Sequence, residues 1–207
     1  MRILKYSIGA LIVATTLGLS GRATAANLVS NGDFELANLG AANSSGSGYW
    51  TFNAGNSGIN NWTVGMTSVD IVRAPYPFYG TQALDLVGTP GPGSVEQTLA
   101  TVAGGTYEVR FQLYWTGSAI NRQINVSLGS QSLNGLELNP SDTWLSFNLT
   151  FINVEANALL RLSTNPNNGG NGNTFIDNIT VEAPVPEPLT MVLAGGALAA
   201  AIRRRRR

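Results

Sequence analysis

The fold is decided by the stretch Thr106-Tyr107-Glu108-Val109-Arg110-Phe111-Gln112-Leu113-Tyr114-Trp115. Its odd-numbered side chains are all apolar or aromatic, whereas its even-numbered side chains are polar apart from Tyr114. Side chains alternate between the two faces of a strand, so this period of two indicates a strand with one buried face. The stretch therefore predicts a β-strand that packs on a core.

The same alternation recurs on both sides of this stretch, and helical periodicity is almost absent. Clear strands are predicted at 123–128, 144–151 and 174–181, with Ala158, Leu160 and Leu162 in another. Weaker strands are predicted at 27–29, 62–64, 68–72, 83–86 and 94–99. Segments 37–60 and 164–173 are rich in Asn and Gly and are expected to be loops. About ten short strands in one domain predict an all-β fold, a two-sheet jelly-roll sandwich.

The N-terminus has the three parts of a secretory signal peptide. Arg2 and Lys5 give a positive start, residues 8–19 form an apolar run, and Ala23-Thr24-Ala25 fits a cleavage site with small residues. We therefore expect residues 1–25 to be removed on export, leaving a β-sandwich ectodomain at 26–183.

The C-terminal segment, 184–207, combines a helix-breaking motif, a short apolar run and a positive cluster. The apolar run 189–202 has 14 residues, so as a helix it reaches about 21 Å, less than the hydrocarbon core of about 30 Å. The arginines after it are expected to stay in the cytoplasm. Such a weak transmembrane helix suits a tail that holds the protein in the inner membrane only until it is processed.

This tail resembles a PEP-CTERM sorting signal, a family found in bacteria that make exopolysaccharide. The residues that carry the resemblance are Pro186, Glu187, Pro188, Arg203, Arg204, Arg205, Arg206 and Arg207. The resemblance implies an exosortase-like membrane enzyme as the processing partner, and the cell surface or extracellular matrix as the destination. An ordinary tail anchor with a proline-rich linker is the alternative.

Composition restricts the function of the ectodomain. Residues 26–183 hold four arginines, no lysine and eleven carboxylates, a net charge of −7. Nucleic-acid binding is not expected, because phosphate contacts need Lys and Arg. The chain has no cysteine and no histidine, which excludes disulfides, thiol nucleophiles, Ser-His-Asp triads and the usual zinc sites. The domain must be stabilised by its core, or by a hard cation with oxygen ligands.

The ectodomain opens with Asn27-Leu28-Val29-Ser30-Asn31-Gly32-Asp33-Phe34-Glu35 and closes with Phe175-Ile176-Asp177-Asn178-Ile179-Thr180-Val181. Its course resembles the choice-of-anchor C family. That family is similar to galactose-binding-like jelly rolls, which include carbohydrate-binding modules and a plant cell-wall protein family. In many of these jelly rolls the two end segments share a structural Ca²⁺. The resemblance implies Glu35 and Asp177 as ligands, with Asp33 as a further candidate.

The alternation offers separate evidence on Asp177. This residue shares parity with Phe175, Ile179 and Val181, so its side chain is expected to face the core. A buried carboxylate needs a cation, an arginine or several hydrogen-bond donors. Calcium ligation and hydrogen bonds from backbone amides at the strand ends both satisfy this need, and both remain open.

An aromatic loop is the candidate ligand-binding element. Tyr76, Phe78 and Tyr79 lie in a proline-stiffened segment, where exposed rings can stack on sugars. The alternative is that Phe78 and Tyr79 pack onto the sandwich, as aromatic side chains do by default. For catalysis the carboxylates are the only candidates, and a glycosidase needs two of them about 5–10 Å apart. Eleven scattered acids can supply such a pair by chance, so no catalytic residue is assigned.

Three functions fit these observations. The first is an exported, non-catalytic protein of the cell surface or matrix that binds polysaccharide. The second is a carboxylate-dependent glycoside hydrolase or lyase. The third is a structural matrix protein whose domain binds no small ligand.

Overall fold

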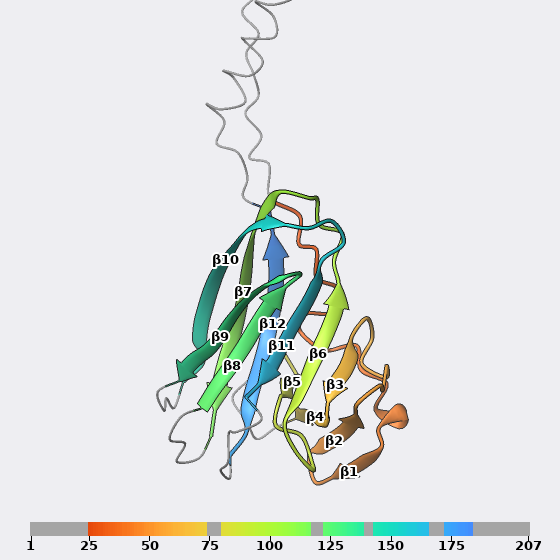
Figure 1. Ribbon diagram of the computed structural model, residues 1–207. Coiled ribbons are helices and arrows are strands. Elements are labelled where there is room, and N and C mark those ends of the chain that lie inside the picture. Colours follow the sequence, from red (N-terminus) through yellow and green to blue (C-terminus); the bar gives the residue numbers. More distant parts are fainter. Residues whose placement is uncertain (1–24, 74–79, 117–121, 139–142, 166–171, 184–207) are drawn as a thin grey trace, which may run out of the picture. The chain divides into compact units, whose positions relative to one another are not determined.

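The computed structural model describes residues 25–73, 80–116, 122–138, 143–165 and 172–183. Residues Ala25–Pro184 form one compact unit. The predicted signal peptide and sorting tail lie outside the described residues. Twelve strands are present in the described part, in two antiparallel sheets (Figure 1). The seven-stranded sheet has the order β1 (Ser44–Gly46), β2 (Tyr49–Asn53), β4 (Ser68–Arg73), β5 (Gln82–Asp85), β12 (Thr174–Glu182), β7 (Gly105–Trp115), β10 (Leu145–Val154).

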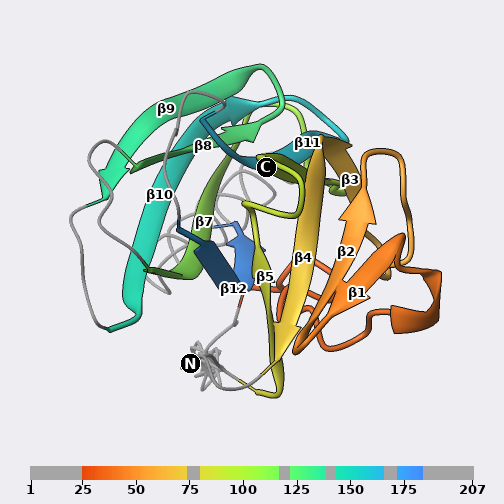
Figure 2. The same cartoon turned by 90° about the horizontal axis from the view of Figure 1, so that it is seen from below.

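The second sheet has five strands and lies against the first as a second layer (Figures 1 and 2). Its order is β3 (Thr63–Met66), β6 (Gly93–Thr98), β11 (Leu159–Thr164), β8 (Arg122–Leu128), β9 (Gln131–Leu138). The eight strands β5 to β12 thus run β5-β12-β7-β10 in one sheet and β6-β11-β8-β9 in the other. This is the strand order of a jelly roll, so the predicted fold class is confirmed.

The larger hydrophobic cluster lies between the two sheets, and we call it the main core. The predicted alternation of β7 is observed, because Tyr107, Val109, Phe111, Leu113 and Trp115 are all buried in the main core. β8 and β11 contribute its other layer through residues such as Val126 and Leu162. On each strand, the side chains of opposite parity point away from this core. We call these surfaces the outer faces of the two sheets.

The predicted loop at 37–60 is wrong in part. It contains a 3-10 turn, Leu39–Ala41, and the hairpin β1–β2, whose second strand pairs with β4. Strand β9 was also not expected. Residues 27–29, predicted as a strand, are not a strand of either sheet. Most of the predicted loop at 164–173 lies outside the described residues, and Thr164 belongs to β11.

The predicted direction of Asp177 is also wrong. The register of β12 shifts between Asp177 and Thr180, and Asn178 there has φ 51°. This bulge breaks the parity, so Ile176, Ile179 and Val181 all lie in the main core. Asp177 pairs directly with Gln112, whose side chain bonds to Ser146 on the outer face. Directly paired residues project to the same face, so Asp177 lies on the outer face, although its side chain is buried.

None of the helical segments in the described ranges is long and apolar enough to cross a membrane. The apolar run at 189–202 lies outside those ranges.

Candidate functional site

The opening segment, residues 27–35, runs along β12. The amide of Leu28 donates to the carbonyl of Val181, and the amide of Val181 donates to Asn27 Oδ1, at 2.9 and 3.0 Å. The amide of Ile179 donates to the carbonyl of Gly32 at 2.9 Å. The first and last segments of the domain therefore meet, as the resemblance implied. The link between them consists of hydrogen bonds.

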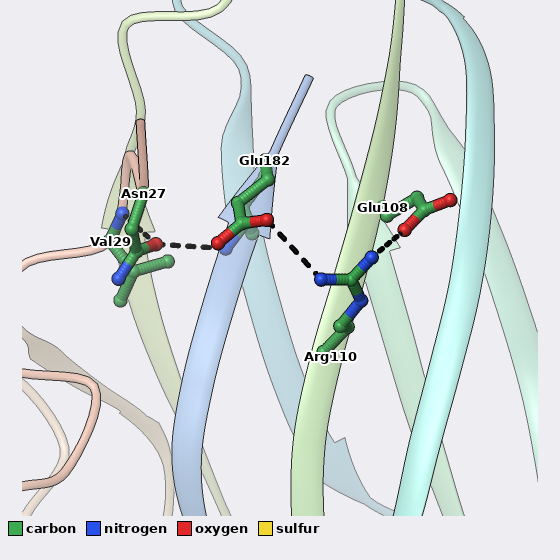
Figure 3. A network of polar contacts seen from close by, with 6 residues as sticks. Asn27, Val29, Glu108, Arg110 and Glu182 are labelled. Atoms are coloured by element: carbon green, nitrogen blue, oxygen red, sulfur yellow. Dashed lines mark hydrogen bonds and ion pairs between the residues drawn. The ribbon is translucent and has the colours of Figure 1, made fainter. Parts of the chain in front are cut away.

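Figure 3 shows the network of polar contacts around Asn27, Arg110 and Glu182. Asn27 Oδ1 also accepts a hydrogen bond from the amide of Val29 at 3.0 Å. Nearby, Arg110 forms ion pairs with Glu108 and with Glu182, the latter at 3.2 Å (Figure 3). All three side chains are partly exposed, and exposed ion pairs contribute only about 0–1 kcal/mol. This network is therefore a solvated surface feature.

Asn31 organises the turn inside the opening segment. Its φ is 54°, its Oδ1 accepts from the amide of Leu36, and its Nδ2 donates to the carbonyl of Asn60. The buried indole of Trp62 donates to the Asn31 carbonyl at 2.9 Å and packs on the ring of Phe34, with centroids 5.5 Å apart. The Asn-Gly-Asp-Phe-Glu motif is thus a structural element that joins the chain start to the core.

Glu35 has a structural role as well. Its Oε1 accepts hydrogen bonds from the amides of Thr81 and Gln82, at 2.7 and 3.0 Å, and its Oε2 accepts one from the Thr81 hydroxyl. Partial burial acts to raise the pKa of Glu35, but these hydrogen bonds and the charge of Arg73 outweigh it and lower that pKa. Asp33 is exposed, and its Oδ1 lies 3.5 Å from the amide of Glu35. Glu35 therefore fixes the entry to β5.

Asp177 accepts the amide of Asn178 on its Oδ1 at 2.7 Å. This agrees with the second interpretation of that residue, an acid bonded to a backbone amide. No group of three acidic side chains suited to a metal ion occurs among the described residues. Both oxygens of Glu35 already accept N–H or O–H hydrogen bonds, so the charge of Glu35 needs no cation to be stabilised. A calcium ion shared by Asp33, Glu35 and Asp177 stays a prediction that these contacts do not support.

Tyr76, Phe78 and Tyr79 lie outside the described residues. The strands that flank their loop, β4 and β5, carry a second apolar cluster on the outer face of the seven-stranded sheet. Val72, Ala83 and Phe175 form its buried base. Tyr49, Tyr114 and Trp144 are partly exposed and pack against that base. We call these six residues the aromatic face.

The rings of the aromatic face are in mutual contact. Tyr114 lies 5.8 Å from Trp144 and 5.9 Å from Phe175, measured between ring centroids, and is nearly parallel to Phe175, with 15° between the planes. Tyr114 and Trp144 therefore present a continuous aromatic surface. Gln112 and Ser146, bonded to each other at 2.9 Å, place polar groups on the neighbouring positions of the same strands.

Two carboxylates adjoin the aromatic face. Strand pairing places Thr51, Asp70, Asp85, Phe175 and Tyr114 in one row across five strands of the outer face. The exposed fractions of Asp70 and Asp85 are only 5% and 1%. Both line a polar cavity of about 320 Å³, together with Tyr49, Val72, Thr89 and Asn173 among others. We call it the acid-pair pocket.

The sequence analysis did not identify this pair, although a signal was present. Asp70 and Asp85 each stand between apolar neighbours, Val69 and Ile71 in one strand and Leu84 and Leu86 in the other. This pattern places each acid on the outer face of a strand with a buried inner face. The pattern does not show that these two strands pair with each other.

A second hollow lies on the outer face of the five-stranded sheet. It measures about 390 Å³, and Asn125, Ser127, Asn134, Arg161 and Ser163 are among the lining residues. Arg161 Nε lies 3.3 Å from Glu96 Oε1. None of the described residues that line this hollow is aromatic. It offers hydrogen bonds without a surface for stacking.

Several solved structures are similar to this chain at low sequence identity. A cyclase from Fischerella sp. TAU has 14% identity and a TM-score of 0.52, over 79% of this chain and all of the cyclase. The arabinose-bound MgGH51 α-L-arabinofuranosidase has 12% identity and a TM-score of 0.52, over 81% of this chain and 28% of the enzyme. TmCBM61 in complex with β-1,4-galactotriose has 15% identity and a TM-score of 0.43, over 77% of this chain and all of that module.

Identities this low bear on the fold alone. No curated protein sequence matches the chain. Residues 27–182 match the family described as "Protein of unknown function (DUF642)". This match runs from the start of the opening segment to the end of β12 and covers most of the chain. The chain therefore belongs to the DUF642 family.

Proposed function

We propose that this protein is an exported, non-catalytic component of the cell surface or extracellular matrix that binds polysaccharide on its aromatic face. The observation that carries this proposal is the contact of partly exposed Tyr114 and Trp144 rings beside a row of polar side chains. Sugar rings have one apolar face and a rim of hydroxyls. Binding sites that combine a few convergent polar groups with aromatic walls match that chemistry.

The electrostatics of the domain favour a neutral sugar chain. The net charge of −7 on residues 26–183 repels a polyanion, whereas neutral hydroxyls can donate to Gln112, Ser146 and the acid pair. The described residues that line the hollow on the five-stranded sheet include no aromatic side chain, so we assign this hollow no stacking role. The predicted rings of Tyr76, Phe78 and Tyr79 belong to the loop between β4 and β5 and are part of the same proposal.

Export and sorting rest on sequence motifs. The signal peptide at 1–25 and the Pro-Glu-Pro, apolar and arginine parts of 184–207 support a route through the inner membrane to an exosortase-like enzyme. The choice-of-anchor resemblance implies that this type of domain occurs with several alternative sorting tails. Such exchange of tails fits a domain that functions outside the cell.

A glycan array probed with the whole chain tests the binding function. We expect binding of at least one neutral polysaccharide, and a loss of about tenfold or more for Trp144→Ala, since stacking surfaces of this size contribute 1–3 kcal/mol. Trp50→Ala is the matched control, because Trp50 packs on the main core and lies under Arg73, with Cζ 5.2 Å from the ring. Equal losses in both variants would refute the assignment of the site.

The acid pair makes catalysis the second candidate. Asp70 and Asp85 lie opposite each other in paired strands, where Cβ atoms are about 5 Å apart, so their carboxyl groups are close enough to be tested as a glycosidase pair. The same array, followed by analysis of released sugars, separates the two functions. If sugars are released, and if Asp85→Asn abolishes that release, the function is hydrolysis or elimination and not binding alone. Silence on every glycan would favour a purely structural matrix protein.

A further inference from the structure

The hollow on the five-stranded sheet lies over two neighbouring rows of polar side chains. Each row consists of residues that are direct partners in paired strands, so its side chains project to the same face of the sheet. The first row is Ser94, Ser163 and Asn125, and the second row is Glu96, Arg161, Ser127 and Ser132. All of these residues except Ser94 and Glu96 line the hollow. The sheet therefore gathers hydroxyl, amide and guanidinium groups at one place on its outer face.

Arg161 is the charged residue among the described residues that line the hollow. Its side chain is 41% exposed, and its Nε forms an ion pair with Glu96 Oε1 at 3.3 Å. An ion pair through Nε leaves the two NH₂ groups of the guanidinium for other acceptors. The charges of Arg161 and Glu96 cancel, and the net charge of −7 on residues 26–183 disfavours an anion. A neutral molecule with oxygen acceptors therefore suits this hollow.

Two irregular backbone positions shape the hollow. The register of β8 with β9 shifts between Ile124 and Val126, and the amide of Gly135, whose φ is 67°, donates to Asn125 Oδ1 at 2.8 Å. This bond orients the Asn125 amide and leaves its Nδ2 as a donor for a ligand. Met66, at the end of β3, lines the hollow with φ 55°. Bulges and strained residues of this kind are concentrated at functional sites.

The groups around the hollow match the hydroxyl rim of a sugar. The Arg161 guanidinium and the Asn125 amide donate, whereas the hydroxyls of Ser127, Ser132 and Ser163 both donate and accept. The volume of about 390 Å³ lies within the range of about 300–1,000 Å³ found for ligand sites. None of the described lining residues is aromatic. Binding in this hollow therefore depends on hydrogen bonds and not on stacking.

We propose that this hollow is a second sugar-binding site, and that the domain bridges two polysaccharide chains. The inference rests on the proposed function for the first site, the aromatic face. The aromatic face and the hollow lie on the outer faces of different sheets, which form the two layers of the sandwich (Figures 1 and 2). Stacked sheets are about 10 Å apart, so a sugar chain on one outer face cannot reach the other without turning round an edge of the sandwich. Each domain is therefore a cross-link between chains.

Turbidity of the whole chain mixed with soluble neutral polysaccharides (galactan, glucomannan and dextran) tests the bridging. A protein with two sites joins long sugar chains into particles that scatter light, and an excess of short oligosaccharide of the same sugar dissolves them. Binding to the same polysaccharide on a surface needs only one site. We expect Arg161→Gln and Ser127→Val each to abolish the turbidity and to weaken surface binding by about tenfold, because avidity is lost. Trp144→Ala should do the same from the other face.

Arg110→Gln is the matched control. Arg110 is an arginine of similar exposure, 48%, on the outer face of the other sheet, and it does not line the hollow. We expect this variant to keep the full turbidity. Turbidity retained in both Arg161→Gln and Ser127→Val would overturn the second site without affecting the first. Binding that is lost in Arg161→Gln and unchanged in Trp144→Ala would refute the aromatic face and, because one site remains, the bridging. A chain that binds none of the polysaccharides would overturn both.

Discussion

Replacing Gly32 by alanine should destabilise the domain severely. A Cβ at this position would lie 2.0 Å from the carbonyl oxygen and 3.0 Å from the carbonyl carbon of Ile179. Both are backbone atoms of β12, so the opening segment must move away from the strand. The hydrogen bond from the Ile179 amide to the Gly32 carbonyl, at 2.9 Å, would then break.

The expected cost combines two effects. An overpacked contact costs about 1–3 kcal/mol, and a buried amide without its partner costs about 1–3 kcal/mol. Together they lower the free energy of unfolding by about 2–6 kcal/mol, a large part of the 5–15 kcal/mol typical of a domain. With a urea m-value of about 2 kcal/mol/M, the unfolding midpoint should fall by roughly 2 M. Tryptophan fluorescence in a urea titration measures it.

Gly55→Ala is the control for this experiment. Gly55 has φ +83° and no atom within 4 Å of an added Cβ, so alanine there meets only the cost of a left-handed backbone, about 1–2 kcal/mol. If Gly32→Ala lowers the midpoint no more than Gly55→Ala does, the close contact between the opening segment and β12 is wrong.

Two further predictions concern Glu35 and the tail. Because the folded state lowers the pKa of Glu35 below its ordinary 4.5, its contribution to stability is present above that pH and is lost as pH falls through the folded pKa. Glu35→Gln should therefore flatten the fall in melting temperature below pH 4.5; an unchanged profile would show that its bonds to Thr81 contribute nothing. Replacing Arg203 to Arg207 by neutral residues should impair membrane retention and processing, because the positive cluster orients a short span. Fractionation and mass analysis showing normal retention and size would contradict the sorting function.

The inner face of the sandwich could be predicted from the sequence because alternation reports it directly. The ten residues of 106–115 fall on the two faces of β7 as expected, and Ile124, Val126 and Leu128 of β8 are buried as expected. The hairpin β1–β2 escaped prediction because Asn, Gly and Ser dominate its surroundings. Strand β2 forms because Phe52 reaches the main core while β4 supplies its hydrogen bonds. Such pairing between distant segments is not visible in local composition.

The bulge in β12 explains the error at Asp177. A single extra residue, Asn178, reverses the alternation of inward and outward side chains along β12. The only local sign of this bulge in the sequence is the asparagine itself, because asparagine tolerates a positive φ. The candidate site depends on pairing in the same way. Asp70 and Asp85 are 15 positions apart in the chain, and only the register of β4 with β5 makes them neighbours.

These contacts indicate different roles for the end segments of the domain and for the outer face of the seven-stranded sheet. The motif residues Asn31, Gly32 and Glu35 use their polar groups on backbone partners, so substitutions there should act on folding before they act on any ligand. Asp70 and Asp85 are different, because they line the polar cavity that adjoins the aromatic face. Substitutions there should therefore act on a ligand of that face as well as on folding.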